Sequence, residues 1–365
     1  MLRARYIMVG GFLGAGKTTA ILEVAQRLIA QGLRVGLISN DQSVGLVDTT
    51  MFGSGGLPTE EISGGCFCCR FQSLVEAAQK LATEARPDAF LAEPVGSCTD
   101  LQATVSYPLK QLYGDDYSVA PLSVLVDPIR ASRLLGLRPG KTFSPKVNYI
   151  YNKQLEEADV IVINKVDLLE ASQLEELHAA LQAAYPAAEV VRASARSGDG
   201  IDQWMAAIAA DAPRARDAMK VDYETYAEGE ALLGWLNLSA TLRGDSFDGN
   251  QLLSSLIAAI GARLAADGIE VAHLKATLAP NQGNDLAVAN LVLNGGQAER
   301  SHDLAAPLEE GELLVNLRAE GDPAALEAIT REQIAAAART ANAAFDILHC
   351  EAFRPSPPTP THRYA

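Results

Sequence analysis

The chain has 365 residues, of which 48% are apolar and 21% charged, a globular composition with room for two domains. Its 45 acidic and 30 basic residues give a formal charge of −15, which argues against a nucleic-acid partner because phosphate binding needs a basic surface. No apolar run approaches the roughly 18 residues that a membrane span requires, and the short apolar start leads into a phosphate-loop pattern rather than a signal-peptide cleavage site.

The first 212 residues alternate short apolar, often β-branched runs with longer helical patterns, which is typical of βαβ units around a parallel sheet. This alternation predicts an α/β fold, a doubly wound and mostly parallel sheet, in a domain covering residues 1–212. The predicted strands lie at 6–9, 34–38, 89–92, 122–126, 160–163 and 190–191, and two clear helical patterns lie at 18–30 and 172–184.

The first predicted strand runs directly into G-F-L-G-A-G-K-T, a full match to the P-loop pattern G-x-x-x-x-G-K-[S/T]. The glycines let backbone N–H groups converge on phosphate oxygens, Lys17 would neutralise the β- and γ-phosphates, and the Thr18 hydroxyl would bind Mg²⁺. A glycine-rich turn that merely begins a helix would not require the adjacent Lys-Thr pair. The predicted nucleotide-binding residues of this loop are Gly11, Gly14, Ala15, Gly16, Lys17, Thr18 and Thr19.

Two later loops carry candidate Mg²⁺ and switch residues. Asp41 and Asp48 follow the second predicted strand, and the third strand ends in Glu93-Pro-Val-Gly96. A carboxylate at such a strand end can hold Mg²⁺ or its waters, and a glycine N–H can sense the γ-phosphate. We predict that the catalytic residues are Lys17, Asp41, Glu93 and Gly96, and that Thr18, Asp48 and Glu93 lie at the Mg²⁺ ion.

Three of the five cysteines fall in the motif G-G-C-F-C-C, as Cys66, Cys68 and Cys69. This odd, clustered set does not suit a disulfide framework and indicates a metal site in a reducing compartment, so we expect a cytoplasmic protein. In an extended segment Cys66 and Cys68 would face the same side, and Cys69 would join them if the chain turned. Three thiolates favour Zn²⁺ or another thiophilic transition metal over Mg²⁺.

The alternatives for this cluster are buried structural cysteines and a redox pair. Cys98 lies two residues after Gly96. It is either a fourth ligand tied to the switch region or a small apolar side chain.

A second nucleotide element, Asn164-Lys165-Val-Asp167, follows the predicted strand at 160–163. N-K-x-D reads guanine, because the Asp167 carboxylate can accept from both N1–H and N2–H₂, a donor pair that adenine lacks. The alternative is a helix-capping turn. Ser194 and Ala195, after the last predicted strand, would form the loop that backs the base.

A proline and clustered charges near 211–222 indicate a linker, after which residues 223–353 predict a small α+β domain. The tail, 354–365, is rich in proline and is predicted to be disordered. In the second domain we expect strands at 232–242, 271–278, 286–293, 312–317 and 345–352, and helices at 249–266 and 324–344.

The P-loop, the G-G-C-F-C-C cluster, the Glu-x-x-Gly loop and N-K-V-D occur in the order found in the CobW-type GTPases, relatives of the urease and hydrogenase nickel-insertion GTPases. The first 210 residues therefore resemble that family, and the motif H-L-K-A-T-L in the second domain resembles part of its small carboxyl-terminal domain. The resemblance implies a P-loop GTPase fold, GTP and Mg²⁺ as ligands, and metal delivery to a client protein. It implies that Cys66, Cys68 and Cys69 are the metal-binding C-x-C-C of the family.

The sequence departs from the family pattern in the loop after the second predicted strand. Ser39, Gln42 and Ser43 replace the Glu, Phe and Gly of the family's Glu-Asn-Glu-Phe-Gly loop, which removes support for a second, carboxylate metal site there. Some relatives are linked to cobalamin or corrinoid proteins, so the implied client is a metalloprotein or a corrinoid protein.

We therefore predict a GTP-hydrolysing metallochaperone that delivers zinc, or a cobalt- or corrinoid-related metal, to a client. Hydrolysis should be slow, because no arginine finger can be assigned, and a partner or a second copy in a homodimer would supply one. One alternative is a nucleotide-gated zinc sensor or buffer that binds a partner without metal transfer. Another is a P-loop kinase or ATPase in which N-K-V-D is incidental.

Overall fold

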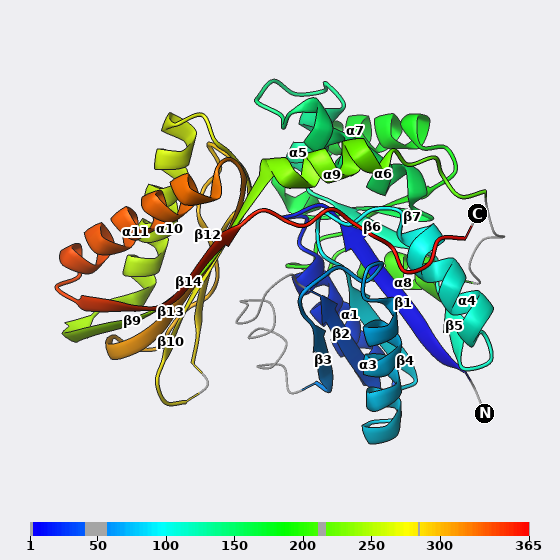
Figure 1. Ribbon diagram of the computed structural model, residues 1–365, viewed down its shortest axis with the longest axis horizontal. Coiled ribbons are helices and arrows are strands. Elements are labelled where there is room, and N and C mark those ends of the chain that lie inside the picture. The colour runs from blue at the N-terminus through cyan, green and yellow to red at the C-terminus, as the bar shows by residue number, and fades with distance from the viewer. Residues whose placement is uncertain (1–2, 41–56, 211–216, 284, 365) are drawn as a thin grey trace. The chain divides into compact units, whose positions relative to one another are not determined.

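The computed structural model describes residues 3–40, 57–210, 217–283 and 285–364 (Figure 1). These residues form two compact units. The first unit contains the described residues up to Gly229 together with the segment that begins at Pro357, and the second runs from Glu230 to Ser356. Among the described residues, no helix is both long and apolar enough to cross a bilayer.

The first unit is built around an eight-stranded sheet whose pairings are all parallel. The strand order is β3-β2-β4-β1-β6-β7-β8, with β5 beside β1. This arrangement confirms the predicted doubly wound, mostly parallel sheet. The strands are β1 (Ala4–Gly11), β2 (Val35–Asn40), β3 (Thr59–Ile62), β4 (Ala89–Glu93), β5 (Tyr117–Val119), β6 (Ser123–Val126), β7 (Val160–Ile163) and β8 (Glu189–Arg192).

Helices flank this sheet (Figure 1). Central strands such as β7 are buried along their whole length, as expected when helices cover both faces of a parallel sheet. The α-helices are α1 (Lys17–Ala30), α3 (Phe71–Glu84), α4 (Tyr107–Tyr113), α5 (Pro128–Leu134), α6 (Pro145–Glu157), α7 (Ala171–Ala184), α8 (Ile201–Ala209) and α9 (Tyr223–Leu232), with a π-helix, η1 (Gln102–Ser106), and a 3₁₀ turn, η2 (Val166–Leu168). In such sheets the ligand crevice lies outside the carboxyl ends of the strands, where the loops after β1, β4 and β7 meet.

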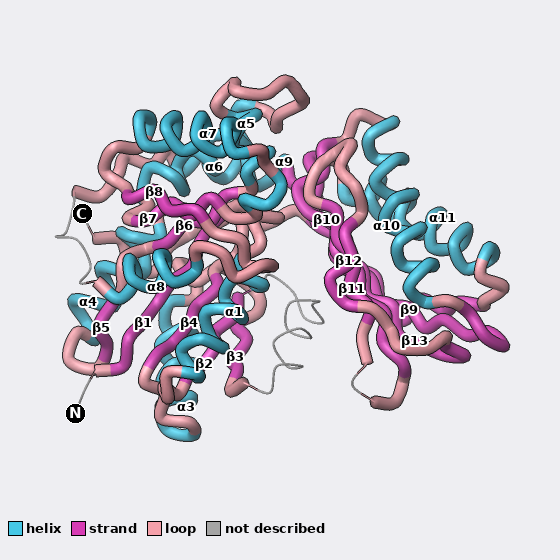
Figure 2. The backbone as a smooth tube through the Cα atoms, turned by 180° about the vertical axis from the view of Figure 1, so that it is seen from behind, coloured by secondary structure: helices cyan, strands magenta, loops and turns pink. Residues whose placement is uncertain are grey.

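The second unit is an antiparallel sheet of order β12-β11-β10-β13-β9-β14 that packs against two helices (Figure 2). Leucine and isoleucine side chains of α10 fill the core with alternate residues of the strands. Asp248 and Asp322 cap the two helices by accepting hydrogen bonds from backbone N–H groups. The elements are β9 (Leu233–Phe247), α10 (Gly249–Ala266), β10 (Glu270–Pro280), β11 (Ala287–Leu291), β12 (Glu299–His302), β13 (Leu308–Glu320), α11 (Pro323–Thr340) and β14 (Ala344–Phe353).

Two boundaries differ from the sequence prediction. The second unit begins at Glu230 rather than 223, because Tyr223 and Tyr226 of α9 make polar contacts within the first unit. The tail was predicted to be disordered, yet the segment beginning at Pro357 belongs to the first unit and makes specific hydrogen bonds there. Part of the predicted linker, 211–216, lies outside the described residues.

Candidate functional site

The P-loop connects β1 to α1, and its backbone conformation requires glycine. Gly11, Gly14 and Gly16 have φ values of 133°, 81° and 87°, a region that other residues rarely adopt. A Cβ atom on Gly11 would lie 2.4 Å from the Leu125 carbonyl oxygen, and one on Gly16 would lie 2.6 Å from the Asn164 side-chain nitrogen. Gly16 is the N-cap of α1, so the N–H groups of the first helical turn are oriented toward the site that would hold phosphate.

The side chains of the P-loop meet the end of β4. Glu93 Oε1 accepts a hydrogen bond from Thr18 Oγ1 at 3.2 Å and lies 3.8 Å from Lys17 Nζ, and the Lys17 and Glu93 side chains are only 7% and 10% exposed. A hydroxyl and a carboxylate are the oxygen donors that Mg²⁺ prefers, so Thr18 and Glu93 fit such an ion. Thr19 is exposed on the first turn of α1. Asp41 and Asp48, also predicted near Mg²⁺ or the switch, lie outside the described residues.

The N-K-V-D segment is tied to the P-loop by side chains. The side-chain amide of Asn164 donates to the Ala15 carbonyl at 2.9 Å, and its oxygen, Oδ1, accepts from the Ala195 N–H at 3.1 Å. Lys165 donates to the Gly14 carbonyl at 2.9 Å. The structure thus places two predicted regions of the nucleotide site, far apart in sequence, in direct contact.

Asp167 and Ser194 form the other half of this region. The Ser194 hydroxyl donates to Asp167 Oδ1 at 2.7 Å, which orients the carboxylate predicted to read guanine. Both residues sit at the carboxyl end of the sheet, where η2 and the loop after β8 begin.

Asp127, which follows β6, both caps a helix and contacts the N-K-V-D segment. It caps α5 by accepting from the N–H groups of Ile129 and Arg130, and its Oδ2 lies 2.9 Å from Lys165 Nζ. Burial would raise the pKa of Asp127, but the Lys165 ammonium and the Arg130 N–H hold it below its usual value. Its place directly after the strand β6 is the feature of the sequence that could have identified Asp127.

The three clustered cysteines share one small volume. Sγ of Cys66 lies 2.9 Å from that of Cys68 and 3.1 Å from that of Cys69, and the remaining Sγ pair is 3.8 Å apart. Ligand sulfurs at a tetrahedral zinc, with Zn–S near 2.3 Å, are about 3.8 Å apart, so small shifts suffice to fit the ion. Within the part of the chain that the structure describes, this is the one group of His, Cys, Asp and Glu side chains close enough to hold a metal.

The backbone around these cysteines differs from the extended segment considered from the sequence. Cys69 N and Arg70 N both donate to the Cys66 carbonyl, so the chain turns and leads into α3. Asn40, at the end of β2, donates to the carbonyls of Ile62 and Gly65 at 2.9 and 2.7 Å and so fixes the start of this cysteine turn. The turn is what lets Cys69 join the other two thiols.

Sulfur contacts shift the thiol pKa values in opposite directions. Hydrogen bonds from Cys68, Cys69 and Cys98 lower the pKa of Cys66. The Cys68 thiol donates to the Cys66 thiolate, and this hydrogen bond together with burial raises the pKa of Cys68. The Cys66 contact raises the pKa of Cys69 to about 11. A first thiolate therefore forms most easily at Cys66, and the deprotonation of the others would be driven by a bound metal.

Cys98 is buried next to Cys66, with which it shares a side-chain hydrogen bond. It does not belong to the group whose sulfurs all lie within 4.8 Å of one another. The prediction that Cys98 is a fourth ligand therefore remains a prediction, although the structure brings this thiol to the edge of the cluster.

A single loop, residues 93–100, joins the nucleotide region to the thiols and is called the coupling loop here. It starts at Glu93, passes Gly96, where an added Cβ would lie 2.8 Å from a Leu13 methyl carbon and 3.1 Å from the Leu13 nitrogen, and reaches Cys98. Gln154 of α6 holds its middle by donating to the carbonyls of Gly96 and Cys98 at 3.0 and 2.8 Å. The sequence did not identify Gln154, because glutamine in a helix carries no motif.

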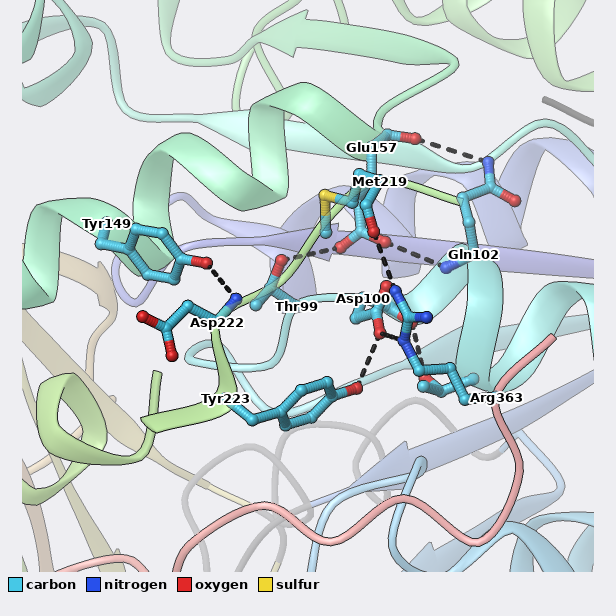
Figure 3. A network of polar contacts seen from close by, with 10 residues as sticks. Thr99, Asp100, Gln102, Tyr149, Glu157, Met219, Asp222, Tyr223 and Arg363 are labelled. Atoms are coloured by element: carbon cyan, nitrogen blue, oxygen red, sulfur yellow. Dashed lines mark hydrogen bonds and ion pairs between the residues drawn. The ribbon is translucent and has the colours of Figure 1, made fainter. Parts of the chain in front are cut away.

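The coupling loop ends in a buried polar network (Figure 3). Glu157 accepts from the Gln102 N–H at 2.9 Å and from the Thr99 hydroxyl at 3.2 Å. Burial, with a smaller effect of nearby Asp100, raises the pKa of Glu157 to about 8. Asp100 itself is 1% exposed and accepts from the Tyr223 hydroxyl at 2.7 Å.

The chain matches a known family and several of its members in sequence. The family model for the CobW/HypB/UreG nucleotide-binding domain matches residues 5–192, just over half of the chain. The zinc chaperone CobW of Sinorhizobium sp. is 30% identical over 186 residues, which are 46% of this chain and 52% of that protein. The zinc chaperone YeiR of Escherichia coli K12 is 31% identical over 163 residues, 44% of this chain and 46% of that protein.

Among solved structures, the Zn(II)-bound YjiA GTPase from E. coli aligns with 87% of this chain and 95% of its own, at a TM-score of 0.38 and 15% identity. In sequence, the chain spans about half the length of the two zinc chaperones it matches.

Proposed function

Because the chain belongs to the CobW/HypB/UreG family of nucleotide-binding proteins, we propose that it is a GTP-hydrolysing metallochaperone. GTP and Mg²⁺ would bind at the P-loop and the N-K-V-D segment, and the cargo would be a thiophilic transition metal held by Cys66, Cys68 and Cys69. Zinc is the preferred cargo, since three clustered thiols favour a thiophilic metal and two relatives carry the name zinc chaperone. The client would be a metalloprotein in the reducing compartment where these thiols persist.

The observation that carries this proposal is the coupling loop. Glu93 contacts Lys17 and Thr18 at its start, Gly96 packs against the P-loop, and Cys98 contacts Cys66. A γ-phosphate bound beside Lys17 would compete with Glu93 for that ammonium, and the loop would shift to relieve this repulsion. Any such shift would move Cys98 relative to Cys66, so the nucleotide state and the metal affinity would be linked. The linkage is reciprocal, because bound metal would then change the affinity for the nucleotide.

The residues present make hydrolysis slow without help. Lys17 and Mg²⁺ held by Thr18 and Glu93 would stabilise charge on the phosphates. No arginine among the described residues is assigned to the γ-phosphate, so a client or a second copy of the chain would supply the remaining positive charge. The Asp167 carboxylate would select guanine over adenine.

Metal transfer distinguishes a chaperone from a zinc sensor or buffer. The full-length protein would be loaded with Zn²⁺ and either GTP or a non-hydrolysable analogue, and zinc release would be followed with a chromogenic chelator. We expect GTP turnover to speed release by about tenfold or more, the size of a typical coupling between two sites. A Lys17→Ala variant should release zinc at the same rate with both nucleotides. Equal rates in the wild type would instead support a sensor or buffer.

A further inference from the structure

Residues 357–364 form a docked segment beside the cysteine turn. Their exposure alternates, with Pro358, Pro360, His362 and Tyr364 half-buried and the residues between them exposed. A period of two is that of an extended chain lying on a surface. The segment is held at its far end by Tyr364 N, which donates to the Ala103 carbonyl at 2.9 Å.

This segment contacts Cys68 and Cys69 directly. Thr361 N donates to the Cys68 carbonyl at 2.8 Å, and the Thr361 hydroxyl donates to the Cys69 carbonyl at 3.2 Å. Thr359 N donates to Cys69 Sγ at 3.2 Å. Cys69 is the least buried of the three clustered thiols, so these residues lie at the side of the cluster that is nearest to solvent.

An ion pair between Arg363 and the buried carboxylate of Asp100 anchors the segment. Arg363 Nε lies 2.7 Å from Asp100 Oδ2, and Arg363 Nη2 donates to the Met219 carbonyl at 2.8 Å (Figure 3). Because Asp100 is 1% exposed, its carboxylate cannot be left without a cationic partner at low cost. The His362 ring adds an edge-to-face contact with Phe71, at 5.0 Å between centroids, at the start of α3.

We propose that residues 357–364 are a removable strap over the thiol cluster. When docked, the strap donates an N–H to the Cys69 sulfur, fixes the turn that carries Cys68 and Cys69, and retains the bound metal. When it is displaced, Cys69 becomes open to a ligand of the receiving protein. This inference deepens the proposed function and rests on it for the identity of the cargo.

The anchor of the strap also lies on the coupling loop. Asp100 is the last residue of the loop that begins at Glu93 and passes Gly96. The P-loop contacts the start of this loop, and the strap contacts its end. A shift of this loop would move Asp100 relative to Arg363 and loosen the strap. Metal release would then have two linked steps, a change at the thiols and the opening of their cover.

The strap is tested first in metal-free, full-length protein, by the rate at which iodoacetamide alkylates Cys69, located by peptide mass spectrometry. Arg363→Ala removes the anchor and should raise this rate about tenfold or more, because it favours local opening of the segment. Thr359→Pro removes the N–H donor to Cys69, together with the exposed Thr359 hydroxyl that contacts the Pro357 carbonyl, and gives a second variant that leaves Asp100 and Arg363 intact. Arg354→Ala is the matched control, since Arg354 contacts Ala231 and Asp322 within the second unit.

The second arm follows zinc loss to a chelator from protein loaded with Zn²⁺. Outer-shell partners of metal ligands contribute roughly 10- to 100-fold to metal affinity, so Arg363→Ala and Thr359→Pro should each release zinc about tenfold faster than wild type and Arg354→Ala. Wild-type alkylation and release rates in both variants would overturn the strap. The alkylation arm needs no metal, so it can succeed even if zinc delivery, and with it the proposed function, fails.

Discussion

Replacing Asp167 with alanine is expected to remove the preference for GTP over ATP. The Asp167 carboxylate is oriented by the Ser194 hydroxyl at 2.7 Å and lies on the segment that Asn164 ties to the P-loop. A site built to pair with two donors discriminates strongly against a base that lacks them, so GTP affinity should fall by a factor on the order of 10³ while ATP affinity changes little. Competition of unlabelled GTP and ATP against a fluorescent guanine nucleotide measures both values.

Asp199→Asn is the matched control for this experiment. Asp199 lies five residues after Ser194 and accepts a hydrogen bond from the Ser197 hydroxyl, but it is exposed. The Asp199→Asn substitution should therefore leave the preference for GTP over ATP unchanged. A wild-type ratio of GTP to ATP affinity in Asp167→Ala would show that N-K-V-D does not read the base and would favour a kinase or ATPase.

The second large effect is expected from Cys66→Ser. Cys66 is central to the cluster, because its sulfur lies within 3.1 Å of both neighbours and also contacts Cys98, and its pKa is the one that these contacts lower. Loss of this ligand removes the thiolate that forms first and should reduce zinc affinity by at least about 100-fold, more than outer-shell changes typically cause. An anaerobic competition titration with a zinc chelator gives the affinity.

Cys350→Ser supplies the control for this variant. Cys350 is a partly buried thiol of β14 in the second unit, beside Glu327 and Arg331, and is not part of the cluster. We expect it to keep wild-type zinc affinity. Unchanged affinity in Cys66→Ser, or equal losses in both variants, would contradict a metal site at the cysteine turn.

The sequence predicted best the features that local pattern determines. The strand at 160–163 matches β7 because four buried β-branched residues have few other places to lie. The P-loop is equally local, since its glycines and the Lys-Thr pair specify a strand, a turn and a helix within a few residues. Short edge strand β3 was missed because Glu60 and Glu61 interrupt its apolar pattern and only Ile62 is buried.

What the sequence could not predict depends on contacts between distant residues. Arg363 and Asp100 are 263 positions apart, and nothing in the local pattern of either identifies the other. Proline-rich segments usually lack a packing partner, so disorder was the natural expectation for the tail. The one available signal was the alternation of Pro358, Pro360, His362 and Tyr364, whose larger or ring-bearing side chains now face the first unit. In the same way, the turn that gathers the cysteines depends on Asn40, more than twenty residues away.

Linkage between nucleotide and metal is the central claim, and the most direct test is zinc affinity measured with GDP or with a non-hydrolysable GTP analogue bound. The wild type should differ by at least tenfold between the two states, about 1.4 kcal/mol. In Gly96→Ala, whose added methyl would meet Leu13 at 2.8 Å, the coupling loop is pushed away from the P-loop and the difference should shrink. Equal zinc affinity in the two nucleotide states of the wild type would contradict the account.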